Sequence, residues 1–122
     1  MDDADSTSAF GREGEELAGA ILENEGWTIL ARNFRAGRGE IDLIALKEDL
    51  LAFVEVKCWS RNGLRDLEDS IDKGKIRRII ETSKIFLSKY RQYSGKKIRY
   101  DVFLLSPARQ PKRYEGAFDE TV

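Results

Sequence analysis

Two strand-like segments separated by three polar residues constrain this chain more than any other feature. Residues 40–46 and 50–57 are largely apolar, contain β-branched and aromatic side chains, and are each long enough to form a strand. Lys47, Glu48 and Asp49 between them suit a tight turn. We therefore predict a β-hairpin over residues 40–57.

The turn determines which residues face each other across this hairpin. Side chains two positions apart in a strand share a face, so Glu55 and Lys57 are neighbours. If the turn centres on Glu48 and Asp49, the opposed pairs are Leu46 with Leu51, Ile44 with Phe53, and Asp42 with Glu55. Two like charges placed opposite each other are destabilising, whereas a divalent cation with oxygen ligands would turn that repulsion into a binding site. The alternative is an exposed hairpin end with a surface Lys–Glu pair, and spacing alone leaves both open.

The other elements follow one another closely and suggest one domain. The spacing of apolar residues predicts helices over 9–25 and 72–93, strands over 27–31 and 98–105, and a short edge strand or turn over 114–118. Pro107 and Pro111 are predicted to break the chain, and residues 1–8 to form a flexible N-terminus before a single domain of residues 9–122. The order is αβββαβ. A strand, helix, strand passage implies a right-handed crossover with parallel pairing, so we expect an α/β fold whose mixed central sheet is flanked by helices.

The residue types that the chain lacks narrow its chemistry. It has one cysteine, Cys58, and no histidine, which excludes an internal disulfide, Cys/His zinc sites and nucleophiles activated by histidine. Carboxylates, lysines and a metal on oxygen ligands remain. No apolar run approaches the roughly 20 residues of a membrane span, and the acidic N-terminus lacks the basic start of a secretory signal. We therefore expect a cytoplasmic protein with no membrane partner.

Charge is segregated along the chain, although the net charge is only -1. Residues 1–60 hold 13 acidic and 6 basic residues, whereas residues 61–113 hold 6 acidic and 15 basic ones. A carboxylate-rich site beside a surface that attracts polyanions would explain this division. The basic side chains that we expect to contact phosphates of nucleic acid are Arg35, Arg38, Arg61, Lys75, Arg77, Arg78 and Lys84. A solvated helix face is the alternative for any one of them.

Several short motifs together resemble one known family. They are Gly-Glu-Ile-Asp-Leu-Ile at 39–44, Phe-Val-Glu-Val-Lys at 53–57, Gly-Arg-Glu-Gly-Glu at 11–15, Asn33 with Arg35, and Lys75. The combination resembles the YraN-like family of predicted endonucleases. That family is similar to archaeal Holliday-junction resolvases and to the PD-(D/E)xK superfamily, whose restriction-endonuclease-like core has the αβββαβ order.

The resemblance implies roles for particular residues. Asp42, Glu55, the Val56 carbonyl and Glu15 would hold Mg²⁺ or Mn²⁺, and Lys57 would orient the attacking water or stabilise the transition state. Glu16 competes with Glu15 for its role. Ile41 stands where the superfamily name has proline.

The segment after the lysine departs from the family pattern. Cys58, Trp59 and Ser60 come before Arg61, which would replace the family's arginine from a shifted position. Trp59 suits either stacking on a base or packing beside a strand end.

Metal-dependent cleavage of nucleic acid, branched DNA in particular, is the expected function. Because such substrates have two-fold symmetry, a homodimer would supply two cuts, and a monomer is the alternative. The alternatives are a module that binds nucleic acid without cutting it and a purely structural domain.

Overall fold

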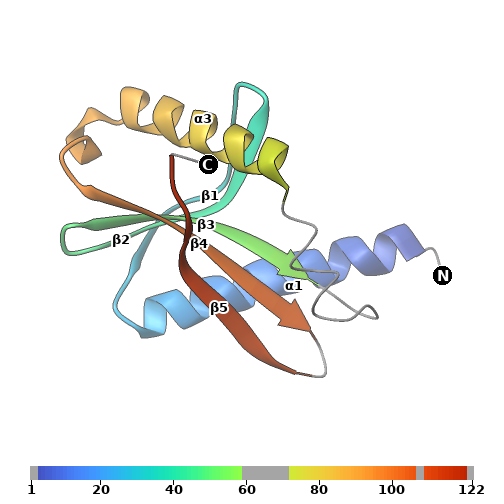
Figure 1. Ribbon diagram of the computed structural model, residues 1–122. Coiled ribbons are helices and arrows are strands. Elements are labelled where there is room, and N and C mark those ends of the chain that lie inside the picture. The colour runs from blue at the N-terminus through green and yellow to red at the C-terminus, as the bar shows by residue number, and fades with distance from the viewer. Residues whose placement is uncertain (1–2, 59–71, 107–108, 121–122) are drawn as a thin grey trace.

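A computed structural model describes residues 3–58, 72–106 and 109–120 of the chain. Figure 1 shows one sheet with a helix on each of its faces. The five strands lie in the order β1-β2-β3-β4-β5. The elements are α1 (Asp3–Asn24), β1 (Thr28–Ala36), β2 (Gly39–Lys47), β3 (Leu50–Cys58), α3 (Lys73–Lys89), the 3-10 helix η1 (Arg91–Tyr93), β4 (Lys97–Ser106) and β5 (Arg109–Phe118).

The sheet is mixed, as the sequence predicts. β1, β2 and β3 form an antiparallel meander, β3 and β4 are parallel, and β5 is antiparallel to β4. The parallel pair requires a crossover, and α3 lies on that connection. The αβββαβ order expected of a restriction-endonuclease-like core is therefore present, with β5 added at the edge.

Alternation along the central strands produces two separate cores. On one face, Leu43, Ala52 and Val54 pack with Ala18 and Leu22 of α1. On the other face, Ile44 and Phe53 pack with residues of α3, including Ile79 and Phe86. The helices are thus held by apolar stripes on opposite sides of the same strands (Figure 1). Within the described residues, no helix is long and apolar enough to cross a membrane.

The β2–β3 hairpin has the predicted register. Leu46 pairs with Leu51 and Ile44 pairs with Phe53, across a two-residue turn at Glu48 and Asp49. Glu48 has a φ of 54°, in the left-handed region that tight hairpin turns require. The ladder of paired residues ends at Leu43 and Val54, one step before the two acidic residues.

The ends of several elements differ from the predictions. α1 begins at Asp3, six residues earlier than predicted. β1 runs to Ala36 instead of ending at Ala31, because Gly37, with a φ of 60°, closes a tight turn into β2 where a longer loop was predicted. Flexibility of residues 1–8 stays a prediction.

The last helix and strand also differ in extent. The predicted helix over 72–93 is α3 followed by the separate turn η1, since Tyr90 leaves the helical conformation. β5 has ten residues instead of five and contains Pro111, which was predicted to break the chain. An edge strand tolerates proline because one side of its backbone needs no partner in the ladder. Pro107 lies outside the described residues.

Close contacts fix α3 against the β1–β2 hairpin. The Thr82 hydroxyl lies 3.2 Å from the Ala36 carbonyl and 2.8 Å from that of Arg78. A β-carbon at Gly39 would lie 2.5 Å from Thr82 Oγ1 and 2.9 Å from the Arg78 carbonyl oxygen. Only glycine lets the strand approach the helix this closely.

Candidate active site

The candidate site lies where β2 begins and β3 ends, beneath the first turn of α3. Figure 1 shows the beginning of α3 near the arrowhead of β3. A cavity of about 210 Å³ opens there. Its lining comes from the β1–β2 turn, β2, β3 and α3, and consists of Arg38, Gly39, Glu40, Asp42, Glu55, Lys75, Arg78 and Ile79.

Asp42 and Glu55 form a carboxyl pair at the base of this cavity. Glu55 is buried, with a side chain 7% exposed, and Asp42 shares a hydrogen bond with it. Burial, and then the charge and hydrogen bond of Glu55, raise the pKa of Asp42 from 3.8 to about 8. At neutral pH, Asp42 is therefore the protonated member and donates to the Glu55 carboxylate. The predicted meeting of the two acids across the hairpin is correct.

The backbone of Val56 completes the environment of Asp42. The Val56 N–H donates to Asp42 Oδ2 at 2.7 Å, and this contact acts to lower the pKa of Asp42 against the larger opposing effects. In a strand, the N–H and C=O of one residue point toward the same neighbouring strand. The Val56 carbonyl is therefore directed toward β2, on the side where the predicted ligand role requires it.

Two lysines lie beside the acids, one from each side of the cavity. Lys57 follows Glu55 on the same face of β3 and is half-buried. Burial, and then contact with the Lys75 ammonium, lower the pKa of Lys57. Burial alone would also lower the pKa of Lys75, but Glu55 and the hydrogen bond with Lys57 together raise it. Of the two lysines, Lys75 is therefore the one whose charged form this site favours more.

Lys75 forms an ion pair with the buried Glu55. Its Nζ lies 3.3 Å from Glu55 Oε1, and its side chain is 27% exposed. The Asp72 side chain caps α3 by accepting from the Lys75 N–H at 2.8 Å, which fixes the helix start over the end of β3. We predicted Lys75 as a phosphate contact on the helix surface, whereas the structure places it inside the site. The signal was available, since a crossover helix begins at the carboxyl end of the strand before it.

Glu15 approaches the acid pair from α1. Its pKa is raised by burial and by the charges of Asp42 and Glu40, while a hydrogen bond with Asn33 opposes the rise. Asn33 has a φ of 51°, which asparagine tolerates better than most residues. Among the residues that the structure describes, no three His, Cys, Asp or Glu side chains gather closely enough to hold one metal ion. Direct ligation by Glu15 therefore stays a prediction, and Glu16 is exposed.

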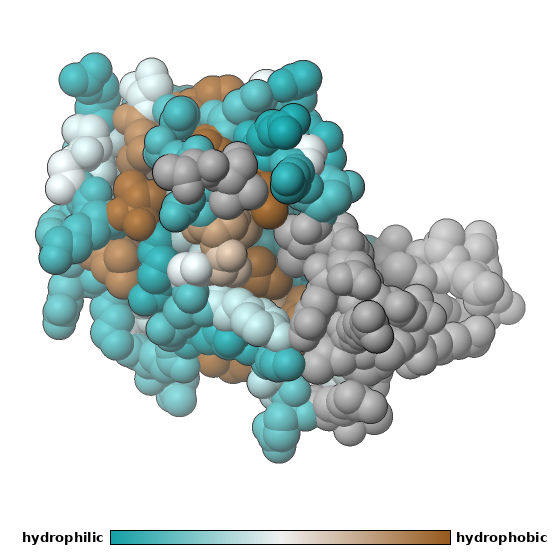
Figure 2. All heavy atoms as spheres, viewed as in Figure 1, coloured by the Kyte–Doolittle hydropathy of each residue, from teal (hydrophilic) through white to brown (hydrophobic). Residues whose placement is uncertain are grey.

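Two arginines stand at the opening of the cavity. Arg38, on the β1–β2 turn, is 76% exposed and binds Glu81 of α3 through two contacts of 3.0 and 3.1 Å. Arg78 is exposed one turn after Lys75. Figure 2 shows hydrophilic side chains over the beginning of α3. The acid pair thus lies at the bottom of a cavity with a cationic rim.

The other predicted phosphate contacts lie farther from the acids or outside the described residues. Arg35 is 79% exposed and pairs with Glu40 at 3.4 Å, while Lys84 pairs with Glu120 at 3.6 Å, near the end of β5. Arg77 is exposed on α3. Arg61 and Trp59 lie outside the described residues.

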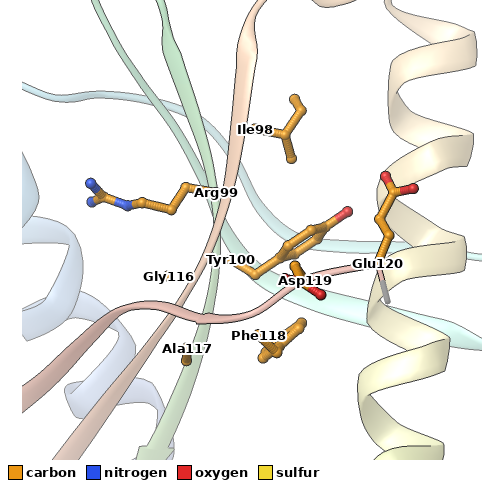
Figure 3. A pocket seen from close by; sticks show the side chains of 8 residues that line it. All are labelled: Ile98, Arg99, Tyr100, Gly116, Ala117, Phe118, Asp119 and Glu120. Atoms are coloured by element: carbon orange, nitrogen blue, oxygen red, sulfur yellow. The ribbon is translucent and has the colours of Figure 1, made fainter. Parts of the chain in front are cut away.

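A second and larger hollow is lined by residues from the beginning of β4 and from the end of β5. It has a volume of about 600 Å³, and Figure 3 shows the side chains around it. The Tyr100 hydroxyl points toward α3, where it shares a hydrogen bond of 2.8 Å with Ser83. Arg99 extends the other way and binds Asp101 through two contacts of 2.8 and 2.9 Å. Asp119 and Glu120 supply carboxyl groups to this hollow, but no lysine is among the described residues that line it.

Comparison with known proteins places the chain in a family. The profile described as "Uncharacterised protein family UPF0102" matches residues 14–105, which include the whole candidate site. The chain belongs to the UPF0102 family. A UPF0102 protein of Persephonella marina is 44% identical over 75% of this chain and 78% of its own length. A UPF0102 protein of Rhodopseudomonas palustris is 36% identical over 91% of this chain and 84% of its own length. One of Mesorhizobium japonicum is 42% identical over 88% of this chain and 85% of its own length.

The site of this UPF0102 protein has the donors that a hard divalent cation requires. Asp42 and Glu55 supply carboxylate oxygens at one point, and the Val56 carbonyl is directed to the same side. Repulsion between the two acids helps to raise the pKa of Asp42, and the Lys75 ammonium pairs with Glu55. A divalent cation would relieve the same repulsion, so the residues present fit Mg²⁺ or Mn²⁺.

Proposed function

We propose that this protein is a metal-dependent nuclease of the PD-(D/E)xK type that hydrolyses phosphodiester bonds. The observation that carries the proposal is the buried contact between Asp42 and Glu55, with Lys57 next to it on the same strand. Two acids and a lysine in this arrangement on adjacent strands match the roles that the resemblance to YraN-like proteins implies. A merely structural pair of acids would have no reason to be buried together at the base of an open cavity.

Each residue of the site has a defined part in such a reaction. Asp42, Glu55 and the Val56 carbonyl would hold the cation. Bound Mg²⁺ or Mn²⁺ would lower the pKa of a water and offset the charge that develops on the phosphate. Lys57, with its lowered pKa, would orient the attacking water or contact the phosphate. Hydrolysis joins the water oxygen to phosphorus and breaks one ester bond, and the proton that the water loses is balanced by the one that the leaving oxygen gains.

Nucleic acid is the substrate class that the charges favour. Arg38 and Arg78 at the rim and Arg77 on the exposed face of α3 can contact phosphates on either side of the scissile bond. Such contacts read the backbone and carry no sequence information, which agrees with a structure-selective nuclease such as a resolvase. Branched DNA is accordingly the first substrate to test, and a two-fold symmetric junction would suit a pair of chains.

A cleavage assay tests the proposal. Purified protein is incubated with branched, single-stranded and duplex DNA and with RNA, with and without Mg²⁺ or Mn²⁺. We expect metal-dependent cleavage that falls by about 100-fold or more in Asp42→Asn, the scale of losing one transition-state contact. Asp49→Asn makes the same substitution in the exposed β2–β3 turn, and this variant should cut normally. Cleavage that persists at the wild-type rate in Asp42→Asn would rule out the proposed mechanism.

A titration separates the nuclease from the alternative. Calorimetry with Mn²⁺ should give heat with the wild type and none with Asp42→Asn. Absence of heat from the wild type, together with DNA binding that weakens as salt rises, would favour a module that binds nucleic acid without cutting it.

A further inference from the structure

The carboxylate of Glu55, a proposed metal ligand, already has a cationic partner within the protein. This carboxylate is 7% exposed, and the ammonium that contacts it at 3.3 Å belongs to Lys75. A carboxylate occupied by an ammonium is a poorer ligand for a divalent cation, because the two positive charges compete for the same oxygen. Lys75 therefore opposes metal binding in the absence of substrate.

The two partners of this ion pair differ in their freedom to move. Glu55 lies within β3, where its backbone is paired with Val102 of β4 and its neighbours Val54 and Val56 are buried. Lys75 lies in the first turn of α3, lines the cavity and is 27% exposed, with four methylene groups between its backbone and its charge. When the pair opens, the lysine moves and the glutamate stays.

Groups around Lys75 can accept its move toward the rim of the cavity. Lys57 lies within hydrogen-bonding distance of Lys75, and the charges of Glu55 and Asp42 act on Lys57 as well, so the acids keep a neighbouring lysine when Lys75 leaves. Arg78 follows one turn later on α3 at the cavity opening, so a phosphate held there would lie near both side chains. A phosphate oxygen would then offer Lys75 a more accessible anion than Glu55 does.

We propose that Lys75 couples metal binding to phosphate binding in this site. A phosphodiester at the rim draws the Lys75 ammonium from Glu55, and Glu55 becomes free to bind the divalent cation. By linkage, the cation raises the affinity for the phosphodiester by the same factor. The affinity of the site for metal is therefore lower until nucleic acid arrives, which limits uncontrolled cleavage. This inference rests on the proposed nuclease function.

Calorimetry measures the coupling directly. Ca²⁺, which takes the same oxygen ligands, is titrated into the protein alone and into the protein saturated with a 12-nucleotide DNA strand, and a gel confirms that the strand stays intact. For the wild type, we expect DNA to raise the Ca²⁺ affinity at least fivefold, within the usual range of about 5- to 150-fold for coupled sites. In Lys75→Met, the Ca²⁺ affinity without DNA should rise by a similar factor, and DNA should add less than twofold.

Arg78→Met is the matched control. It removes a cation from the same cavity, and the cation that pairs with Glu55 is that of Lys75. It should weaken DNA binding and keep the coupling. Lys75→Gln, which retains hydrogen-bonding ability, guards against a folding defect in Lys75→Met, and thermal midpoints check both.

The outcomes distinguish the two proposals. Equal coupling in Lys75→Met, Arg78→Met and the wild type would overturn the role of Lys75 while leaving the nuclease intact. Weaker Ca²⁺ binding in both Lys75 variants without DNA would also overturn it, since it would make Lys75 a support for Glu55. Failure of the wild type to bind Ca²⁺ with or without DNA would remove the proposed function as well.

Discussion

Replacing Asp42 by asparagine should stabilise the metal-free protein, although it destroys the proposed activity. The pKa of Asp42 is raised from 3.8 to about 8 by burial and by Glu55. Between these two pH values the folded protein holds a proton that the unfolded chain releases, so the free energy of unfolding falls as pH rises. Asparagine needs no proton. Its amide oxygen can accept from the Val56 N–H, and its NH₂ group can donate to Glu55.

The magnitude follows from the width of this pH window. One pH unit corresponds to about 1.4 kcal/mol, which sets an upper limit of about 5 kcal/mol at pH 8. Water that enters the cavity and the nearby Lys75 ammonium reduce the penalty. We therefore expect Asp42→Asn to be more stable by less than about 1 kcal/mol at pH 5 and by about 2 to 3 kcal/mol at pH 8.

Urea unfolding in EDTA measures the effect at several values between pH 5 and pH 8. The wild type should lose stability across this range, and Asp42→Asn should change much less. Asp49→Asn, which removes an exposed carboxylate of the β2–β3 turn, should follow the wild type. With Mn²⁺ in place of EDTA, the wild type should become more stable than Asp42→Asn, because the metal stabilises only the wild type. Parallel pH profiles for the wild type and Asp42→Asn would refute the shared proton.

Three further substitutions test the packing and the rim of the site. Gly39→Ala should destabilise the protein by about 1 to 3 kcal/mol in urea unfolding, because its β-carbon would meet Thr82 Oγ1 and the Arg78 carbonyl at under 3 Å. Phe86→Ala should lower the free energy of unfolding by about 3 to 5 kcal/mol, since this buried ring contacts four other aromatic rings. Its control is Ile85→Ala at the adjacent position, where the side chain is 39% exposed and the loss should be less than about 1.5 kcal/mol. Arg78→Ala should weaken DNA binding equally for all sequences and reduce the slope of log affinity against log salt by about 1 in a fluorescence-anisotropy titration.

The central hairpin could be predicted because its signals are local and agree with one another. Alternation places Ile44 and Phe53 on one face, and the turn at Glu48 sets the register, so the contact between Asp42 and Glu55 follows from the sequence. The family resemblance added roles to these positions. It did not supply the register.

The edges of the sheet were harder because their sequences carry weaker patterns. β1 contains a register shift between Ile29 and Ala31 and a left-handed residue at Asn33, which interrupt alternation. β5 contains Pro111 and exposed polar positions that are typical of a loop. The ion pair joins Lys75 of α3 to Glu55 of β3, which are 20 positions apart in the sequence. No local pattern encodes such a contact, and only the position of the crossover helix after β3 pointed to it.

These irregular edges limit how two copies of the chain can meet. A regular edge strand offers a row of unpaired N–H and C=O groups that a second sheet can extend, and natural proteins prevent this with bulges, prolines and charges. Both edge strands carry such features. β1 has a register shift between Ile29 and Ala31, and in β5 Pro111 removes a donor and Gly116 has a φ of 60°. A dimer of this protein would therefore have to form through side chains on its helices or faces. A continuous ten-stranded sheet across the dimer axis would contradict this consequence.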